Sequence, residues 1–359
     1  MQREPTPRPS HPSPQDKTGV PRKPARLFSP RLWPLIVACA IAILGAAAAL
    51  HLREWQTAPS SFMGPSGGVE TPPDIRHGSA ATSSAVVMPP VINRGSPPAR
   101  NPLSPDPEPS TQHFIVEDGE SGAILFQQNA FTPVAPASLT KIMTALLAIE
   151  RGHPSDMVRV DVDAAAFEGG SVMGLEAGSE VSLQDLLYGM MLLSGNDAAV
   201  AIARHIAGSE EAFVRTMNDK AVWLRLGGTH FANPAGFDAD GQYSCPADMV
   251  SLARYAMQYP LFREIVSTQS YQMHGPGKPS TIRNVNDILT AYPGADGVKT
   301  GDTPRAGRSS VATAIRNGHR VYVAFVRSSN GAVADGILLL DWAFGSHTWA
   351  AGPSMPDRR

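Results

Sequence analysis

Cysteine is scarce in this chain, which has two cysteines among 359 residues. Cys39 lies in an apolar run and Cys245 in the region that we expect to fold, so no disulfide can form within that region. The sequence contains no C-x-x-C pair and no H-E-x-x-H or H-x-x-E-H pattern, and its ten histidines are scattered. A zinc mechanism has no visible ligands here, and we expect an activity that needs no metal and no cofactor.

The chain also lacks a strong charge of one sign. Its formal net charge is −2, and no basic stripe occurs outside the first residues. A nucleic-acid-binding domain normally presents a clustered basic surface. We therefore do not expect nucleic acid to be a partner of this protein.

Prolines divide the chain into unequal parts, since 21 of the 33 lie in the first 110 residues. A segment this rich in Pro, Ser and Gly cannot bury enough apolar surface to fold. We expect residues 53–110 to form a disordered linker, residues 111–348 to form one folded domain, and residues 349–359 to form a short tail.

The segment before the linker is predicted to anchor the chain in the cytoplasmic membrane. Leu32 to Leu50 is a run of 19 residues without a charge, long enough to cross a bilayer as a helix. The tail before it, residues 1–31, carries seven basic and two acidic side chains, and the positive-inside rule places that tail in the cytoplasm. We expect residues 32–52 to be a single-pass anchor and the domain to lie in the periplasm or another extracytoplasmic space. The alternative is a signal peptide cleaved near residues 46–49, which exports the same domain.

The expected folded region has strands at both ends. His113–Glu117 and Ile124–Gln128 are predicted to pair across a glycine-rich turn. Near the other end, the Asn-Gly dipeptide at 317–318 separates two β-rich runs, and this dipeptide is the strongest short hairpin signal in a sequence. The second hairpin is expected to consist of residues 308–316 and 319–327.

Five helices are expected in the same region, at residues 136–150, 183–193, 198–207, 209–226 and 333–344. The first is apolar on nearly every face, which is typical of a helix buried all round. Ser182 and Asp185 resemble a capping box at the start of the second, and Asp197 is expected to cap the third. The pattern predicts an α/β (α+β) fold, with an antiparallel sheet of terminal strands packed on a helical cluster.

Ser138 and Lys141 are the candidate nucleophile and base. Their spacing of three residues places both side chains on one face of a helix. A serine hydroxyl is a weak nucleophile until a neighbouring base takes its proton, and lysine can be that base only if burial or nearby positive charge lowers its pKa. The pair alone is weak evidence, because Ser138 can equally be a helix cap and the Lys141 stem can follow an apolar surface.

Two further triplets carry polar side chains. Ser194-Gly195-Asn196 lies in a predicted break between two helices, where the serine can relay a proton and the asparagine amide can fix a substrate carbonyl. In Lys299-Thr300-Gly301, the glycine allows substrate to lie against an edge strand and the lysine places a cation near Lys141. Taken alone, each triplet is more often an ordinary structural segment.

Together, S-x-x-K, S-G-N and K-T-G occur in this order at intervals of 56 and 105 residues, which is the signature of penicillin-recognising serine enzymes. The chain resembles the D-alanyl-D-alanine carboxypeptidase family of low-molecular-mass penicillin-binding proteins. Nearly all of residues 112–347 take part in this resemblance. The segments that carry it include residues 136–144, 173–178, 186–189, 194–199, 230–236 and 296–301.

The resemblance implies a β-lactamase/transpeptidase-like fold for residues 111–348 and a serine D,D-peptidase activity on peptidoglycan stem peptides. By this resemblance, Ser138 attacks the carbonyl between two D-alanines, Lys141 is its base, and Ser194 is the third catalytic residue. The backbone N–H groups of Ser138 and Asp302 are expected to form the oxyanion hole. β-Lactams are expected to acylate Ser138. The implied substrate-binding residues are Asn196, Lys299, Thr300, Gly301 and Asp302. Among these, Lys299 and Thr300 are expected to engage the terminal carboxylate of the substrate.

The chain departs from the family pattern in three respects. The family's C-terminal β-rich domain and amphipathic anchoring helix are expected to be missing, and the N-terminal span is expected to replace that anchor. Asp302 stands where the family usually has an aromatic residue or histidine, so we expect it to weaken binding or activity. Ala235 and Gln242 replace histidines that are common in related sequences.

Three alternative functions remain open. The first is a D,D-endopeptidase that cleaves peptidoglycan cross-links, because the same family includes such enzymes. The second is a penicillin-binding protein with little activity that senses the cell wall. The third, a class A β-lactamase, is disfavoured because it needs a deacylating glutamate in an E-x-x-x-N context, which none of the candidates between S-G-N and K-T-G has: Glu210, Glu211 and Glu264.

Overall fold

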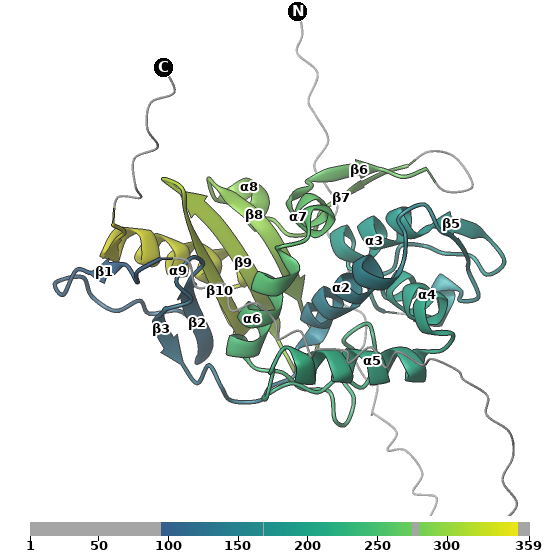
Figure 1. Cartoon of the computed structure of the whole chain (residues 1–359), viewed down its shortest axis with the longest axis horizontal. Coiled ribbons are helices and arrows are strands. Elements are labelled where there is room, and N and C mark those ends of the chain that lie inside the picture. The colour runs from purple at the N-terminus through teal and green to yellow at the C-terminus, as the bar shows by residue number, and fades with distance from the viewer. Residues whose placement is uncertain (1–94, 168, 275–279, 351–359) are drawn as a thin grey trace, which may run out of the picture. The chain divides into compact units, whose positions relative to one another are not determined.

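The structure, a computed structural model, describes residues 95–350 apart from residue 168 and residues 275–279. The predicted cytoplasmic tail, the membrane span, most of the predicted linker and residues 351–359 lie outside the described residues. Figure 1 shows a sheet with helices on both of its faces. This arrangement confirms the predicted fold class.

The sheet has five strands, all antiparallel, in the order β3-β2-β10-β9-β8. Strands from the two ends of the folded region therefore lie side by side at its centre. The predicted turn joins β9 to β10, and its residues Asn317 and Gly318 have positive φ angles of 53° and 84°, as a two-residue type I′ hairpin requires. The strands are His113–Asp118 (β2), Ile124–Gln128 (β3), Ala295–Gly301 (β8), Arg308–Arg316 (β9) and His319–Ser328 (β10).

The central strands separate two hydrophobic cores, because successive residues of a strand point to opposite faces of the sheet. On β10, Val323 and Phe325 belong to a small core that is closed by α9 (Ala332–Ser346). Their neighbours Tyr322 and Ala324 belong to the larger core on the opposite face. The larger core joins the sheet to the helical cluster and places that cluster against the edge strand β8.

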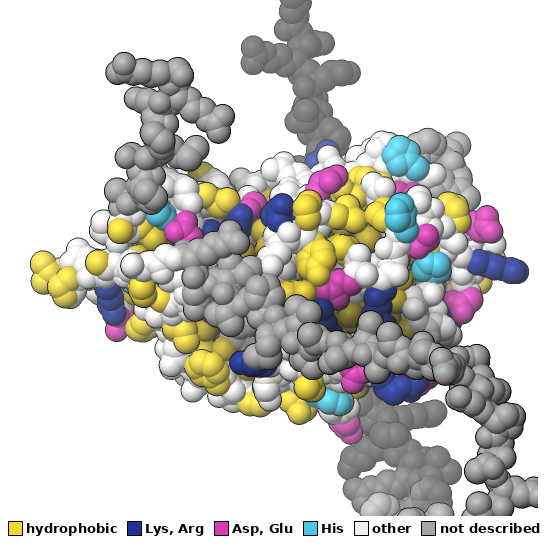
Figure 2. Space-filling model, in the orientation of Figure 1, with side chains coloured by type: hydrophobic (Ala, Val, Ile, Leu, Met, Phe, Trp, Pro, Cys, Tyr) yellow, Lys and Arg dark blue, Asp and Glu magenta, His cyan; other side chains and the backbone are white. Residues whose placement is uncertain are grey.

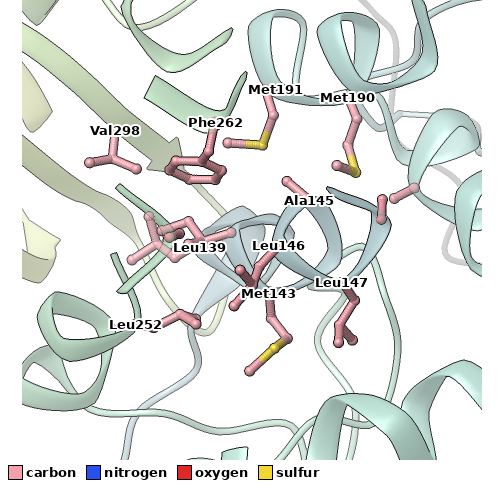
Figure 3. Packing of buried hydrophobic residues seen from close by; sticks show 14 of the residues in the cluster. Leu139, Met143, Ala145, Leu146, Leu147, Met190, Met191, Leu252, Phe262 and Val298 are labelled. Carbon is pink, nitrogen blue, oxygen red and sulfur yellow. The ribbon is translucent and has the colours of Figure 1, made fainter. Parts of the chain in front are cut away.

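Helix α2 (Lys141–Arg151) lies at the centre of the helical cluster, and all of its residues from Lys141 to Ala148 are buried. This confirms the prediction of a helix buried all round. Figure 3 shows Met143 and Leu146 among side chains of the surrounding helices, including Met191 and Phe262. The surrounding helices are α3 (Leu183–Leu192), α4 (Asn196–Ala207), α5 (Glu210–Trp223), α6 (Pro246–Ala256) and α7 (Pro260–Ser267).

Several boundaries differ from the prediction. The helix expected from residue 136 begins with a separate 3-10 turn, η1 (Ala137–Thr140), and α5 ends at Trp223 rather than at residue 226. Helices α6 and α7 were not predicted, although each has a proline at its start, where a missing N–H costs nothing. Also not predicted were the short elements Ala99–Arg100 (β1), Met157–Arg159 (β4), Ala164–Phe167 (η2), Glu180–Ser182 (β5), Ser270–Gln272 (β6), Thr281–Arg283 (β7), Ile288–Ala291 (α8) and His347–Thr348 (β11).

The folded domain begins earlier than predicted. Strand β1 pairs with β11, and the indole of Trp342 donates to the Pro105 carbonyl at 2.8 Å. The backbone N–H and the hydroxyl of Ser110 donate to the Asp335 carboxylate on α9 at 2.9 and 2.6 Å. Residues 99–110, which we call the strap, therefore pack on the domain instead of forming the end of the linker predicted for 53–110.

The face of the molecule in Figure 2 carries no dominant charge. Figure 2 shows basic and acidic side chains interspersed on the face that it presents, in agreement with the formal net charge of −2. Within the part of the chain that the structure describes, none of the helices combines the length and the apolar character needed to span a membrane.

The Ser110–Asp335 contact is expected to stabilise the fold through the strap. Asp335 is 1% exposed and Ser110 is half-buried, so Asp335→Ala removes the charged acceptor of two Ser110 donors, which is expected to cost about 1–3 kcal/mol. The matched control is Asp106→Ala, which removes the exposed ion pair of the strap with Arg100 and is expected to cost less than about 1 kcal/mol. Urea unfolding of both variants measures the difference, and equal midpoints would contradict this account.

Candidate active site

Ser138 lies in η1, at a point where three backbone segments meet. The residue before it, Ala137, has a φ of 49°, a left-handed conformation that costs about 1–2 kcal/mol for a non-glycine residue. Two glycines allow the close approach. A Cβ on Gly236 would lie 1.9 Å from the Ala137 carbonyl oxygen, and a Cβ on Gly301 would lie 3.0 Å from the Ser138 nitrogen. The turn is thus held between the 233–237 loop and the end of β8.

Lys141 begins α2, one turn after Ser138, and its ammonium group has three neighbours. Its Nζ lies 3.0 Å from the Ser138 hydroxyl oxygen, 2.8 Å from Asn196 Oδ1 and 2.7 Å from the Ala235 carbonyl oxygen. The side chain is 0% exposed. Burial is the largest cause that holds the pKa of Lys141 well below its usual range, and the positive charge of Lys299 lowers it further. The negative charge of Asp197 raises this pKa in part.

These contacts set the direction of proton transfer. A neutral lysine amine has two N–H donors and one lone pair. Asn196 Oδ1 and the Ala235 carbonyl can only accept, so they occupy the two N–H groups. The lone pair is then left for the remaining neighbour, the hydroxyl of Ser138. The structure therefore presents the serine hydroxyl to a base whose lowered pKa favours the form able to accept its proton.

Ser194 and Asn196 lie between α3 and α4, in the helix break that the sequence predicts. Ser194 has a φ of 62°, which turns the chain sharply, and it lines the same cavity as Ser138. The Asn196 oxygen accepts from Lys141, so only its amide N–H₂ remains to hold a substrate carbonyl. The structure thus brings both residues to Ser138 and adds a contact with the lysine that the sequence analysis did not predict.

The sequence predicted that Asp197 caps the helix α4, but Asp197 lies within that helix. The residue at the cap of α4 is Gly195, and the fully buried carboxylate of Asp197 accepts backbone N–H groups from residues 173–175 at 2.8–2.9 Å. The 171–175 segment is thereby fixed beside the cavity, where the Ser171 carbonyl accepts from the Asn196 N–H at 2.9 Å. An acidic residue directly after S-G-N was the signal that could have suggested this role.

Lys299, Thr300 and Gly301 lie on β8, which is an edge strand, as predicted. The ammonium of Lys299 donates to the carbonyl of Thr300 at 2.8 Å. Burial lowers the pKa of Lys299 to about 7, since desolvation disfavours the charged form. Lys299 lies close enough for its charge to lower the pKa of Lys141, which supports the predicted proximity of the two lysines.

Two departures from the family pattern have structural roles. The backbone carbonyl of Ala235, rather than its side chain, contacts Lys141. The amide of Gln242 donates to the Thr140 hydroxyl in η1 at 2.9 Å and accepts from the N–H of Ala232. Gln242 therefore connects the loop behind the site to the turn that carries Ser138, a role that the sequence did not suggest.

The predicted residues surround one cavity of about 580 Å³. Ser138, Ser194, Thr300, Gly301 and Asp302 line it directly, whereas Lys141, Asn196 and Lys299 are buried and are not among its lining residues. The lining residues that sequence reasoning missed are Ser171, Val285, Asp287, Arg308, Ser309, Asn330, Gly331, Ala332, Val333 and Ala334.

No group of three or more His, Cys, Asp or Glu side chains that could hold a metal ion occurs among the described residues. Cys245 is buried and forms no disulfide. The polar groups around the cavity are thus hydroxyls, amides, carboxylates, lysines and one arginine. Such groups suit acyl transfer through a serine nucleophile.

The fold and the buried Ser138–Lys141 pair define the class of this protein: it has the active-site arrangement of the serine-type D,D-peptidases. The family of D-alanyl-D-alanine carboxypeptidases matches residues 101–329, and the chain belongs to this family. The match confirms the resemblance inferred from the three motifs.

Curated relatives and solved structures agree with this assignment. The chain is 38% identical to D-alanyl-D-alanine carboxypeptidase DacF of Bacillus subtilis over 65% of this chain and 62% of the relative. It is 33% identical to DacB2 of Mycobacterium tuberculosis, over 70% of this chain and 88% of the relative. The Streptomyces K15 DD-transpeptidase structure matches with a TM-score of 0.64 and 29% identity, over 67% of this chain and 99% of that one. The chain thus spans less than two thirds of the length of DacF.

Replacement of Gly236 tests whether the close approach behind Ser138 is required. Gly236 and Gly178 have nearly equal φ angles, +92° and +90°, but a Cβ on Gly178 has nothing within 4 Å. Gly178→Ala is therefore expected to cost only the backbone strain of about 1–2 kcal/mol. Gly236→Ala adds a collision with the Ala137 carbonyl and should displace Ser138.

The measurements are urea unfolding and the rate of labelling by fluorescent penicillin. We expect Gly178→Ala to keep its labelling rate and Gly236→Ala to lose it by more than about 10-fold, which corresponds to 1.4 kcal/mol or more. Equal labelling rates in the two variants would show that the position of Ser138 does not depend on this contact.

Proposed function

We propose that this protein is a serine-type D-alanyl-D-alanine carboxypeptidase that removes the terminal D-alanine from peptidoglycan stem peptides. The observation that carries the proposal is the position of Lys141 Nζ, 3.0 Å from the Ser138 hydroxyl in a fully buried environment. The order and spacing of the three motifs and the membership of the family support the substrate class.

Acylation begins when the neutral amine of Lys141 takes the proton of the Ser138 hydroxyl. The oxygen of Ser138 then attacks the carbonyl carbon between the two D-alanines and forms a tetrahedral intermediate. The backbone N–H groups of Ser138 and Asp302 stabilise its oxyanion. The closeness of the β8 end to the Ser138 nitrogen, where a Cβ on Gly301 would lie at 3.0 Å, supports this oxyanion hole.

Collapse of the intermediate breaks the C–N bond, and the leaving D-alanine takes a proton that passes from Lys141 through the Ser194 hydroxyl. Water then attacks the ester on Ser138 and loses its proton to the same base. The C–O bond to Ser138 breaks, Lys141 returns the proton to the serine oxygen, and the shortened peptide is released. Asn196 and Thr300 hold the substrate backbone from opposite walls of the cavity. Gly301 allows the peptide to lie against β8, and Lys299 supplies positive charge behind Thr300.

The first test is release of D-alanine from a peptide that ends in D-Ala-D-Ala, together with labelling by fluorescent penicillin. We expect both activities in the wild-type chain and neither in Ser138→Ala, because the alanine has no nucleophile. Circular dichroism and unfolding curves confirm that the variant is folded. Labelling of the wild type without release of D-alanine would favour a penicillin-binding sensor, and absence of both in folded protein would refute the proposal.

A second candidate is reaction of the acyl-enzyme with an amine, or cleavage of an existing cross-link. The match to nearly the whole length of a protein named a DD-transpeptidase favours it. An amine acceptor added to the assay separates the alternatives. Formation of the amide product at the expense of hydrolysis indicates transfer, and cleavage of cross-linked dimers indicates endopeptidase activity.

Lys299 is expected to set the pH at which Ser138 becomes reactive. Burial is the largest cause of the lowered pKa of Lys141, and the positive charge of Lys299 is the second. Lys299→Met removes that charge and should therefore raise the pKa of Lys141. A base with a higher pKa is protonated over a wider range, and the rising limb of the pH profile for penicillin acylation should move to higher pH. Lys220→Met, which removes an ion pair with Glu150, is the control. A rising limb at an unchanged pH in Lys299→Met would contradict this coupling.

We also propose that residues 32–52 anchor the protein in the cytoplasmic membrane, with the catalytic domain in the periplasm or another extracytoplasmic space. The apolar run and the basic residues before it support this orientation. Resistance of the full chain to alkaline extraction from membranes, and its release when residues 1–52 are removed, would support the anchor.

We further propose that β-lactams inhibit the enzyme by acylating Ser138.

A further inference from the structure

A second cavity, of about 460 Å³, lies between the β6–β7 hairpin and α8. Ser270, Thr281 and Arg283 line it from the hairpin, and Asp287 and Thr290 line it from α8 and its cap. We call this space the hairpin cavity. Asp287 also lines the cavity that contains Ser138, so the two cavities adjoin at this carboxylate. The hairpin cavity is therefore placed to receive a further part of a ligand that is bound beside the nucleophile.

The hairpin wall of this cavity is held in place from behind. The ring of Tyr271 on β6 stacks on Tyr188 of α3 with 3.6 Å between centroids, and its hydroxyl donates to Asp185 at 2.8 Å. Successive residues of a strand point to opposite faces. Ser270 and Arg283, which pair across the hairpin, are therefore turned away from α3 and line the cavity. The wall is thus a built surface of the fold.

Asn286 contributes an unpaired amide to the lining of this cavity. Its side chain is 4% exposed, and among the residues that the structure describes its Nδ2 has no hydrogen-bond acceptor. The turn around it is fixed, because the Asn286 N–H donates to Asn284 Oδ1 at 3.0 Å and the Asn284 amide donates to the Thr268 carbonyl at 2.9 Å. Buried donors are rarely left without an acceptor, since that costs stability. A ligand carbonyl in the cavity would complete the pairing of Asn286.

Two opposite charges accompany this amide. Arg283 is exposed, and in the described part of the chain its guanidinium has no hydrogen bond or ion pair. Asp287 is also exposed and would repel a simple anion. A peptide segment matches the whole set, because it offers a carbonyl to Asn286, an N–H group to Asp287 and a carboxylate to Arg283. The hairpin cavity therefore suits a polar peptide that carries a carboxylate.

The order of residues on β8 indicates the side of the scissile bond on which this cavity lies. Thr300 is expected to engage the carboxylate beyond the scissile bond, and the N–H of Asp302, two residues later, is expected in the oxyanion hole. The leaving group therefore points towards the beginning of β8. The turn that carries Val285 leads through α8 into that beginning, and the Val285 N–H donates to the Leu192 carbonyl, just before S-G-N, at 2.9 Å. These positions favour the leaving-group side for the hairpin cavity.

We propose that the hairpin cavity binds the second peptide of a cross-linked substrate, the part that leaves when Ser138 attacks. This inference rests on the proposed serine D,D-peptidase function and goes further, because it assigns a binding site to the leaving peptide. The C–N bond of the cross-link breaks as the ester forms on Ser138, and the nitrogen of the second peptide takes the proton that passes through Ser194. The rest of that peptide places a carbonyl on the Asn286 amide and a carboxylate on Arg283. A single stem peptide releases only D-alanine, which does not extend into this cavity.

The experiment measures kcat/KM for a single stem peptide that ends in D-Ala-D-Ala and for a cross-linked dimer with the same donor peptide. Asn286→Leu and Arg283→Leu should each reduce kcat/KM for the dimer by about 3–10-fold, the effect of one lost hydrogen bond. Release of D-alanine from the single peptide and labelling by fluorescent penicillin should stay within about 2-fold of the wild type, because neither ligand extends into the cavity. Asn286→Leu should also keep or raise the urea midpoint, since it removes a buried unpaired donor.

Two further variants and one further substrate make the result specific. Arg283→Lys keeps the charge and should recover part of the dimer cleavage. Arg159→Leu is the matched control, because this exposed arginine lies on the β4–β5 hairpin and does not line the cavity; its replacement should leave the ratio of dimer to single peptide unchanged. The further substrate is the single stem peptide attached to its disaccharide. A loss on this substrate in Asn286→Leu and Arg283→Leu would show that the cavity binds sugar, and would overturn the proposal.

The outcomes separate this proposal from the function on which it rests. If the wild type acted on neither peptide, the proposed D,D-peptidase function would fail first. If it released D-alanine from the single peptide but left the dimer intact, the role of the hairpin cavity alone would be overturned. Unchanged dimer cleavage in both leucine variants would also overturn it. A loss of equal size on the dimer, the single peptide and penicillin labelling would do the same, because it would indicate a structural defect.

Discussion

The structure of the site depends on one costly arrangement: an amine that is fully removed from water without a carboxylate in contact. Lys141 has two oxygen acceptors and a serine hydroxyl around its Nζ, and the charged form of a buried lysine is strongly disfavoured. Burial therefore turns an ordinary cation into a base. The nearby positive charge of Lys299 acts in the same direction. The buried carboxylate of Asp197 opposes both effects, and its oxygens also accept the backbone N–H groups of the 173–175 segment.

Much of the local structure excludes water from the amine of Lys141 and holds that amine beside the hydroxyl of Ser138. The α2 helix is surrounded by apolar side chains, so its first residue enters the protein interior as soon as the helix begins. The 233–237 loop supplies the Ala235 carbonyl, and the close contact at Gly236 allows that loop to lie directly behind Ser138. Gln242 connects the loop to η1. The left-handed backbone of Ala137 directly precedes Ser138, and that of Ser194 belongs to a residue that lines the same cavity. Surrounding contacts can maintain this strain.

The parts of the fold that could be predicted are those with a local signal. A few consecutive residues are enough to predict the Asn317-Gly318 turn and the buried α2 helix, and the structure confirms both. The three catalytic motifs were recognised by their order. The strap was missed because its stability comes from distant partners, such as Asp335, which is 225 residues from Ser110. Arg308 was missed for the same reason: it belongs to the cavity only because β9 lies beside β8, and no short sequence pattern encodes that pairing.

The charges around the cavity have separate tasks according to their depth. Lys299 is buried and acts on Lys141 through the low-dielectric interior, where a charge has a long reach. A lysine in that position serves proton transfer best if it does not also have to extend into the cavity. Arg308 and Asp302 are exposed where they line the cavity, so solvent screens their charges more strongly than the charge of Lys299.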